Sequence, residues 1–323
     1  MNDFPVLPSV KAVVANARWV RLRPQAFQAA VIRWGGRIEN AGAWDEPFHY
    51  GDGTEETARW IFVLDVLNHC FWPDPGEPVW GVELEGTFYS GYAGLAAALK
   101  KAYLAGFPLT NARYLASMPE KDLEAIFSGA GSIPLFEERL QNLREAGRVL
   151  LERWDADAVR LIEAAKGSAC RLAALCAREF LSFRDQVELE GRTVYFWKRA
   201  QIFAADLAVA FQGKGLGAFR DLDRLTAFAD YKLPQVLREL GILEYAPQLA
   251  EKVERQDLLA PGSREEVEIR ALTVWAVERL KEAFRETSHR RVTSSQVDHW
   301  LWSLGQIPAF RKRPYHRCRT IYY

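Results

Sequence analysis

The segment LTAFADYKLPQVLREL, residues 225–240, carries the most distinctive chemical pattern in the chain. Asp230 stands just before a proline-containing helix start, between Phe228 and Lys232. Its carboxylate can cap that helix, because the free N–H groups and the helix dipole favour an anion. The dipole would equally keep a catalytic carboxylate ionised beside a reacting carbon that gains positive charge. Spacing alone leaves both roles open for Asp230.

Helices must position this segment, because helical periodicity dominates the sequence. The run after Thr54 has a threonine N-cap, acidic residues in its first turn and an apolar middle, which predict a central buried helix. Ser117 and Glu120 have the spacing of a capping box, with Pro119 in the first turn of the next helix. We predict further helices at 9–20, 24–34, 91–105, 133–154, 157–183, 196–212, 232–241, 264–286 and 294–305.

Two segments alternate in polarity and are rich in β-branched and aromatic residues. Residues 79–89 predict a short hairpin, and residues 187–195 predict another with its turn at Glu190 and Gly191. Only QGKGLG at 212–217 suggests a flexible joint, and no internal repeat is visible. The expected fold class is mostly α: one compact multi-helix domain over residues 1–323 with one or two short β-hairpins. Two helical lobes flanking a central pocket would fit within this domain.

Composition and charge exclude several classes of protein. The 323 residues include 42 Lys or Arg and 42 Asp or Glu, so the formal net charge is zero. Nucleic-acid coats and polybasic membrane proteins need a clear excess of positive charge. The first residues lack the pattern of a signal peptide, and no apolar run reaches the roughly 18 residues of a membrane span. We therefore expect a soluble, cytoplasmic, globular protein without a membrane partner.

Known metal and cofactor motifs are missing from the sequence. The four cysteines show no CxxC spacing, and the five histidines do not cluster with metal-ligand spacing. GKGLG lacks the spacing of a phosphate loop, and no HExxH, GxSxG or GxGxxG occurs. We predict no metal and no organic cofactor.

FADYKLPQVL, residues 228–237, closely resembles the signature of the queuosine salvage proteins, which are queuosine 5′-phosphate N-glycosylases/hydrolases. Lys232 is a small departure, because arginine is expected there and lysine cannot form a bidentate fork. The other matches follow in family order along nearly the whole chain: HYGDGTEETARWIFVLDVLNHCFWPD, IPLFEERLQNLREAG, YFWKRAQIFAADL, VEIRALTVWAVE, SSQVDHWLWSLGQ and RPYHRCRTIYY.

The resemblance implies a helical core similar in architecture to helix-hairpin-helix DNA glycosylases. It implies hydrolysis of the N-glycosidic bond of queuosine 5′-monophosphate, which releases queuine, the 7-deazaguanine base salvaged for transfer RNA. Asp230 matches the carboxylate that those glycosylases hold at the head of a helix. The implied partners are this nucleotide and queuine, without direct binding of nucleic acid, and no cofactor is implied.

This reaction asks two things of the site. Cleavage of an N-glycoside develops positive charge on the sugar, and a fixed anion stabilises the transition state more than the substrate. Asp230 suits this task either as a nucleophile or as the stabiliser of an attacking water, and sequence does not separate the two. Because a 7-deazapurine has carbon in place of N7, the departing base needs hydrogen bonds or protonation elsewhere. Tight recognition of the base should therefore matter for the rate.

Three residues are candidates for holding the base. Queuine carries a secondary amine that is charged at neutral pH, and a buried cation needs a carboxylate. Asp298, on the apolar face of the SSQVDHWLW helix, is our candidate for a contact with the base or its amine, and a structural role is the alternative. Phe228 and Trp302 would sandwich the base by stacking, and packing in the core is the alternative for each.

Further candidates come from loops and basic motifs. His49 lies in the HYGDG loop, and loop residues on a rigid scaffold often line sites. Lys198 in YFWKRAQ is a candidate for binding the 5′-phosphate, with Tyr231 as a hydroxyl donor, although a solvated surface charge is the alternative for a lysine. Arg317 and Arg319 could instead close the C-terminal segment over the fold.

Two other function classes stay open. A glycosylase that acts on bases within DNA or RNA would need a basic, salt-sensitive face, which the balanced charge disfavours. A non-catalytic helical protein would bind queuine without turnover. Release of free queuine from queuosine 5′-monophosphate distinguishes an enzyme from such a binding protein.

Overall fold

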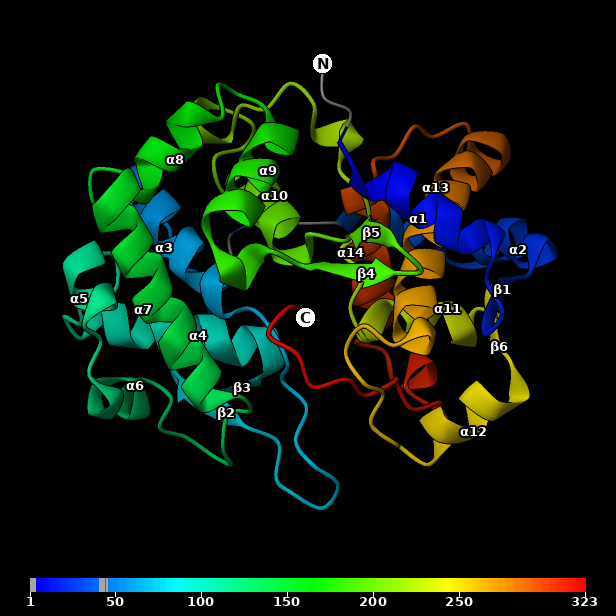
Figure 1. Ribbon diagram of the computed structural model, residues 1–323, viewed down its shortest axis with the longest axis horizontal. Helices are drawn as coiled ribbons and strands as arrows, with labels where there is room; N and C mark the ends of the chain where they lie inside the picture. The colour runs from blue at the N-terminus through cyan, green and yellow to red at the C-terminus, as the bar shows by residue number, and fades with distance from the viewer. Residues whose placement is uncertain (1–3, 41–43, 45) are drawn as a thin grey trace.

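The computed structural model describes residues 4–40, 44 and 46–323, and helices dominate it, as predicted (Figure 1). Its α-helices are α1 (Val6–Ala15), α2 (Pro24–Trp34), α3 (Glu55–Leu67), α4 (Gly91–Leu104), α5 (Ala112–Ala116), α6 (Glu120–Ile126), α7 (Phe136–Arg153), α8 (Ala158–Ala164), α9 (Ala169–Glu179), α10 (Lys198–Ala210), α11 (Lys232–Glu239), α12 (Pro247–Glu254), α13 (Arg264–Ser288) and α14 (Ser294–Leu304). Short 3-10 turns occur at Gly35–Asn40, Leu181–Phe183, Gly215–Gly217, Leu222–Arg224 and Pro308–Phe310.

The strands form short antiparallel pairs. Both predicted hairpins are confirmed: β2 (Gly81–Leu84) with β3 (Thr87–Ser90), and β4 (Gln186–Leu189) with β5 (Arg192–Tyr195). A third pair, which the sequence pattern did not indicate, joins β1 (Val20–Leu22) to β6 (Leu243–Tyr245). The predicted helix at 9–20 was therefore too long, because α1 ends at Ala15 and residue 20 begins a strand. A strand of three residues offers too few alternations for a period to be recognised.

Of the helix caps predicted at Thr54 and Ser117, the first is confirmed and the second is wrong. The Thr54 hydroxyl accepts a hydrogen bond from the Glu56 amide at 3.1 Å, which makes it the N-cap of α3. The capping box at Ser117 does not form. Ser117 follows α5 instead, where its hydroxyl donates to the Arg113 carbonyl at 3.0 Å, and α6 begins after Pro119 without a side-chain cap.

The segment 157–183 forms two helices and a 3-10 turn rather than the single helix predicted. Lys166 and Gly167 have φ angles of 53° and 66°, in the left-handed region, which separates α8 from α9. The structure also adds α12, which the sequence analysis missed. It opens with Pro247, a residue type favoured in the first helical turn.

Two hydrophobic clusters form the interior, and Figure 1 shows α3–α10 on one side with α1, α2 and α11–α14 on the other. The first cluster draws mainly on residues 58–225, and the second combines 10–38 with 194–310. The buried chain passes between them several times, and two of these passages shortly precede candidate site residues. The first crossing, from Phe196 to Trp197, leads into Lys198, and the second crossing, from Leu225 to Ala227, leads into Asp230.

The C-terminal segment lies between the two groups of helices (Figure 1). Arg317 and Arg319 each pair with the Asp74 carboxylate, at 2.8 Å and 2.7 Å, and their guanidinium groups stack on the Trp72 ring. The Cys70 amide donates to the backbone carbonyl of Tyr323, the last residue, at 3.1 Å. This confirms the prediction that these arginines hold the segment over the fold.

Within the described part of the chain, no helix combines the length and apolar character that a membrane span needs. The same residues contain no group of three or more His, Cys, Asp or Glu side chains placed to hold a metal ion.

Candidate active site

Asp230 lies where the second crossing runs into helix α11. Its Oδ1 atom accepts hydrogen bonds from the amides of Lys232, at 2.7 Å, and Leu233, at 2.9 Å, so the predicted capping role is confirmed. The residue is half-buried. Because the cap uses one carboxylate oxygen, it leaves the other oxygen for chemistry. Capping and catalysis are therefore compatible roles for the same side chain.

Asp298 faces the same segment from helix α14, whose first turn is fixed by a capping box. Its side chain is buried, and Oδ2 accepts a hydrogen bond of 2.7 Å from the Phe228 amide. Burial and the negative charge of Asp230 raise the pKa of Asp298 to about 8, against the opposing effects of the Phe228 amide and of Lys198. At neutral pH this carboxyl group is therefore mostly protonated and can donate a hydrogen bond.

Lys198 is the first residue of helix α10, and it is buried. Its amide donates to Oδ2 of Asp185 at 3.1 Å, so the helix is capped from a distant segment. Burial lowers the pKa of the Lys198 ammonium, whereas the negative charges of Asp230 and Asp298 raise it. The alternative of a solvated surface lysine is thereby excluded. Lys198, Asp230 and Asp298 are ionisable side chains that influence one another's pKa, and we call them the central triad.

Two further carboxylates lie near Lys198, and the sequence analysis missed both. Asp65 in α3 is fully buried, and burial together with the charge of Asp206 in α10 raises its pKa. Burial also raises the pKa of Asp206 to about 7, although the charge of Lys198 opposes this. The available signal was an acidic residue inside an apolar helical run, in WIFVLDVL and in QIFAADL.

His49 contacts a tyrosine whose pKa is affected by this acidic pair. Its Nε2 atom lies 2.9 Å from the Tyr92 hydroxyl, and its ring stacks on Trp44 with 4.0 Å between ring centres. Burial and the charges of Asp206 and Asp65 raise the pKa of the Tyr92 hydroxyl. The structure thus places His49 against Tyr92 of α4, within the group of helices α3–α10.

The remaining candidates are aromatic. Tyr231 packs against Tyr315, with ring centres 4.9 Å apart. Phe228 packs against the first hydrophobic cluster, and Trp302 packs against the second and lies 5.8 Å from the His299 ring. The proposed sandwich of a base between Phe228 and Trp302 therefore stays a prediction.

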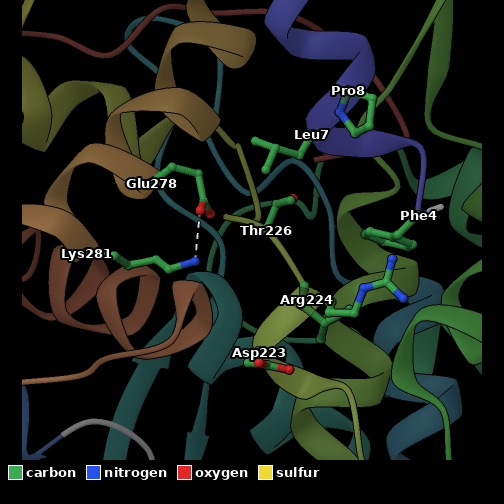
Figure 2. A pocket seen from close by; sticks show the side chains of 9 residues that line it. Phe4, Leu7, Pro8, Asp223, Arg224, Thr226, Glu278 and Lys281 are labelled. Atoms are coloured by element: carbon green, nitrogen blue, oxygen red, sulfur yellow. Dashed lines mark hydrogen bonds and ion pairs between the residues drawn. The ribbon is translucent and has the colours of Figure 1, made fainter.

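A separate surface pocket contains none of these residues (Figure 2). It lies beside the start of α1, and its lysine and glutamate are already paired, with Lys281 Nζ 2.8 Å from the Glu278 carboxylate. We therefore do not place the active site there. The pocket is lined by Phe4, Leu7, Pro8, Asp223, Arg224, Leu225, Thr226, Glu278 and Lys281.

The fold and the central triad define a class: a mostly helical protein that places a lysine and a carboxylate at the starts of two helices, beside a carboxyl group within a third. The carboxylate can stabilise the positive charge that develops when a glycosidic bond breaks. The profile of the family described as queuosine salvage protein matches residues 48–323. The chain belongs to the queuosine salvage protein family, as its motifs predict.

Individual relatives cover nearly the whole chain. A Sphaerobacter thermophilus protein named queuosine 5′-phosphate N-glycosylase/hydrolase is 46% identical over 318 residues, which are 98% of this chain and 97% of that protein. A Mus musculus protein of the same name is 36% identical over 98% of this chain and 96% of its own length. One from Schizosaccharomyces pombe is 34% identical over 100% of this chain and 96% of its own length.

Proposed function

We propose that this protein hydrolyses the N-glycosidic bond of queuosine 5′-monophosphate and releases queuine for salvage into transfer RNA. Family membership and the names of the relatives support this substrate. The observation that carries the chemistry is the central triad, in which Asp230, Asp298 and Lys198 share one partly buried region and influence one another's charge.

Asp230 supplies the anion that faces the sugar. The two amide hydrogen bonds from the start of α11 hold its carboxylate in place before the reaction begins, so little reorganisation is needed as charge develops. A carboxylate in this position acts on the sugar carbon directly or orients the water that attacks it. Both routes need the same negative charge at residue 230.

Asp298 assists the leaving base. Its raised pKa of about 8 keeps the carboxyl group largely protonated at neutral pH, so it can donate a hydrogen bond or a proton. A 7-deazapurine lacks the N7 atom at which ordinary purines are protonated, and a donor elsewhere on the base would ease its departure. Two neighbouring carboxyl groups thereby take different roles, because their environments differ.

The other candidates bind the substrate. Lys198 and Tyr231 take the 5′-phosphate, and His49, Phe228 and Trp302 hold the base. Burial of Lys198 supports its assignment, because a desolvated ammonium interacts more strongly with an anion than an exposed one does. The network of His49 with Tyr92 supports a role in recognising polar groups of the base.

The proposal includes the setting of the reaction. The chain is a single domain over residues 1–323, with architecture similar to helix-hairpin-helix DNA glycosylases and a substrate pocket between its two groups of helices. It works in the cytoplasm without direct nucleic-acid or membrane partners. The equal numbers of acidic and basic residues support a substrate with one phosphate rather than a polynucleotide.

The test is turnover by the purified protein. Queuosine 5′-monophosphate is mixed with a small amount of protein, and free queuine is followed by chromatography. We expect many equivalents of queuine per protein molecule. Equimolar binding without release would instead indicate a binding protein, and release of bases from DNA or RNA oligonucleotides alone would indicate a nucleic-acid glycosylase.

A further inference from the structure

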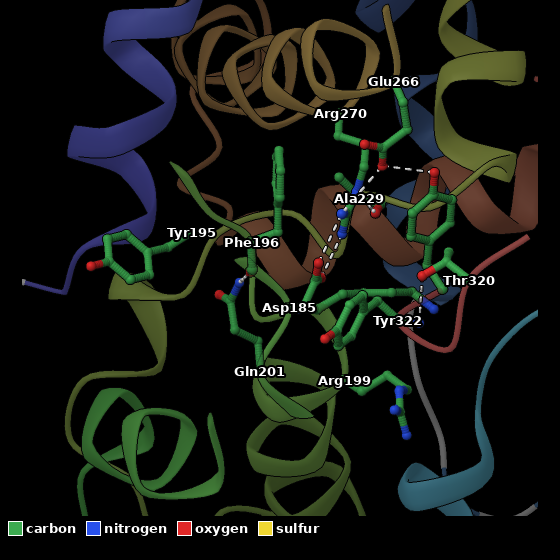
Figure 3. Close-up of polar contacts among 12 residues, drawn as sticks. Asp185, Tyr195, Phe196, Arg199, Gln201, Ala229, Glu266, Arg270, Thr320 and Tyr322 are labelled. Atoms are coloured by element: carbon green, nitrogen blue, oxygen red, sulfur yellow. Dashed lines mark hydrogen bonds and ion pairs between the residues drawn. The ribbon is translucent and has the colours of Figure 1, made fainter. Parts of the chain in front are cut away.

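A buried ion pair outside the proposed chemistry joins the two groups of helices (Figure 3). Nη1 of Arg270 donates to Oδ1 of Asp185 at 2.8 Å, and Nη2 donates to Oδ2 at 2.5 Å. The two side chains are only 4% and 3% exposed. Arg270 lies in α13, within the second hydrophobic cluster, whereas Asp185 directly precedes strand β4.

Asp185 fixes the first crossing and the start of helix α10. Its Oδ2 atom also accepts the Lys198 amide at 3.1 Å. Its backbone carbonyl accepts the amides of Phe196 and Trp197, each at 3.0 Å. Trp197 has a φ of 49°, in the left-handed region, so the chain turns sharply into the helix here. This one aspartate thus determines where Lys198 begins α10.

Arg270 fixes the second crossing. Its Nε atom donates to the Ala229 carbonyl at 3.1 Å, one residue before Asp230. The guanidinium group lies 3.9 Å from the centre of the Phe196 ring and 4.3 Å from that of Tyr323, so it has little freedom to move. A planar, rigid fork of donors therefore holds the peptide before Asp230 and the carboxylate that caps Lys198.

Stability alone is a poor explanation for this pair. Removing two charges from water costs several kcal/mol per ion, and packed apolar residues often serve stability equally well. The contacts instead converge on the two chain crossings that precede catalytic-site residues. We propose that Arg270 and Asp185 are positioning residues, which set the separation between Lys198 and Asp230 during the reaction. This inference rests on the proposed function.

The main test is Arg270→Lys, because lysine keeps the charge but cannot form a fork and reach the Ala229 carbonyl together. We expect kcat for queuine release to fall about 10²-fold, the usual cost of an error of about 1 Å in placing reacting groups. KM should rise by a much smaller factor than kcat falls, because a displaced Lys198 still reaches the 5′-phosphate, whereas the separation of Lys198 from Asp230 matters most in the transition state. Asp185→Asn should show the same split between kcat and KM.

Arg238→Lys is the matched control. Arg238 is also a buried arginine, stacked over the Tyr245 ring at 4.3 Å and bonded to the Glu254 carboxylate at 3.2 Å, but it contacts neither crossing. We expect this variant to lose thermal stability and to keep kcat within about twofold of wild type. If kcat fell equally in Arg270→Lys and Arg238→Lys, the loss of any buried guanidinium group would explain the result, and the proposed positioning role of Arg270 would be wrong.

Hydrogen exchange of the Lys198 amide gives a readout that does not depend on turnover. Exchange at this amide should be faster in Arg270→Lys than in wild type and unchanged in Arg238→Lys, because only the former loosens Asp185. Wild-type kcat with unchanged amide exchange in Arg270→Lys would overturn the inference. Absence of queuine release by the wild-type protein would overturn the proposed function instead, and the exchange experiment would still decide whether Arg270 holds this site.

Discussion

The Phe228 amide donates a 2.7 Å hydrogen bond to Oδ2 of Asp298, which ties helix α14 to the segment that carries Asp230. The bond occupies one oxygen of the Asp298 carboxyl group. Because the pKa of this group is raised to about 8, the other oxygen holds a proton at neutral pH. The site therefore presents a donor from α14 beside a carboxylate at the start of α11.

Asp230→Asn should abolish turnover while leaving the fold nearly unchanged. Asparagine caps a helix about as well as aspartate, but it has no charge to stabilise a sugar cation. We expect kcat to fall by about 10³-fold or more, in line with losing a principal electrostatic contact. Queuine release and thermal unfolding of the same samples measure the two effects, and an active Asn variant would remove Asp230 from its central role.

Asp230→Ala separates the cap from the chemistry. Alanine also abolishes turnover, but it removes the hydrogen bonds to the Lys232 and Leu233 amides and should destabilise the protein by about 1 kcal/mol relative to Asn. Chemical denaturation of both variants measures the difference. Equal stability of the two variants would show that the cap contributes nothing.

Asp298→Asn should change how stability depends on pH. The pKa of Asp298 is about 8 in the folded protein, against about 3.9 for an unperturbed aspartate. Between these values the folded state holds a proton that the unfolded state has lost, so this group's contribution to stability is full at low pH and disappears as pH rises through the folded pKa. The asparagine amide stays neutral at every pH in this range, and the variant should gain stability relative to wild type with rising pH.

Thermal unfolding from about pH 5 to about pH 9 tests this prediction. The control is Asp223→Asn, at an exposed carboxylate, which should run parallel to wild type. If the difference in unfolding temperature between wild type and Asp298→Asn stays constant across this pH range, the raised pKa of Asp298 does not contribute to the pH dependence of stability. The activity of wild type should also decline as pH rises above about 8, because the Asp298 donor is then lost.

Lys198→Met should shift this alkaline limb of activity to higher pH. The positive charge of Lys198 lowers the pKa of Asp298, so its removal lets that pKa rise further. The pH profile of kcat measures the shift, and Lys281→Met, at the paired lysine of the surface pocket, should leave it in place. If Lys198 also binds the 5′-phosphate, Lys198→Met should raise KM for queuosine 5′-monophosphate. KM for queuosine, which lacks the phosphate, should not change. An unmoved limb would mean that Lys198 does not influence Asp298 during the reaction.

Local patterns predicted the elements that depend on neighbours in sequence. The cap at Thr54, the turn at Glu190 and Gly191, and the position of Asp230 before α11 all depend on residues within a few positions. The motifs added the family, because many weak matches in a fixed order are improbable by chance. Local reasoning failed at Ser117, where the hydroxyl had a second partner, the carbonyl four residues earlier.

Contacts between distant segments were beyond such patterns. Asp185 and Arg270 are separated by 85 residues and meet in the interior, and a helical period shows that a position is buried without showing which partner it has. The pairing of β1 with β6 was missed for the same reason. The residues that support the central triad could therefore be identified only in the three-dimensional structure. Asp230 itself could be identified from the sequence.

Gly147→Ala should destabilise the protein, although alanine is normally the better helix former by nearly 1 kcal/mol. A Cβ atom at position 147 in α7 would lie 2.2 Å from the Ala116 amide nitrogen and 2.6 Å from the Ala112 carbonyl oxygen, so α5 and α7 would have to separate. We expect a loss of about 1–3 kcal/mol, the usual cost of overpacking, with kcat of the folded protein unchanged. The control is Gly36→Ala, where a Cβ meets nothing within 4 Å and φ is not positive. Denaturation midpoints of the two variants test the argument: if Gly147→Ala is as stable as wild type, the close approach of α5 to α7 does not constrain residue 147.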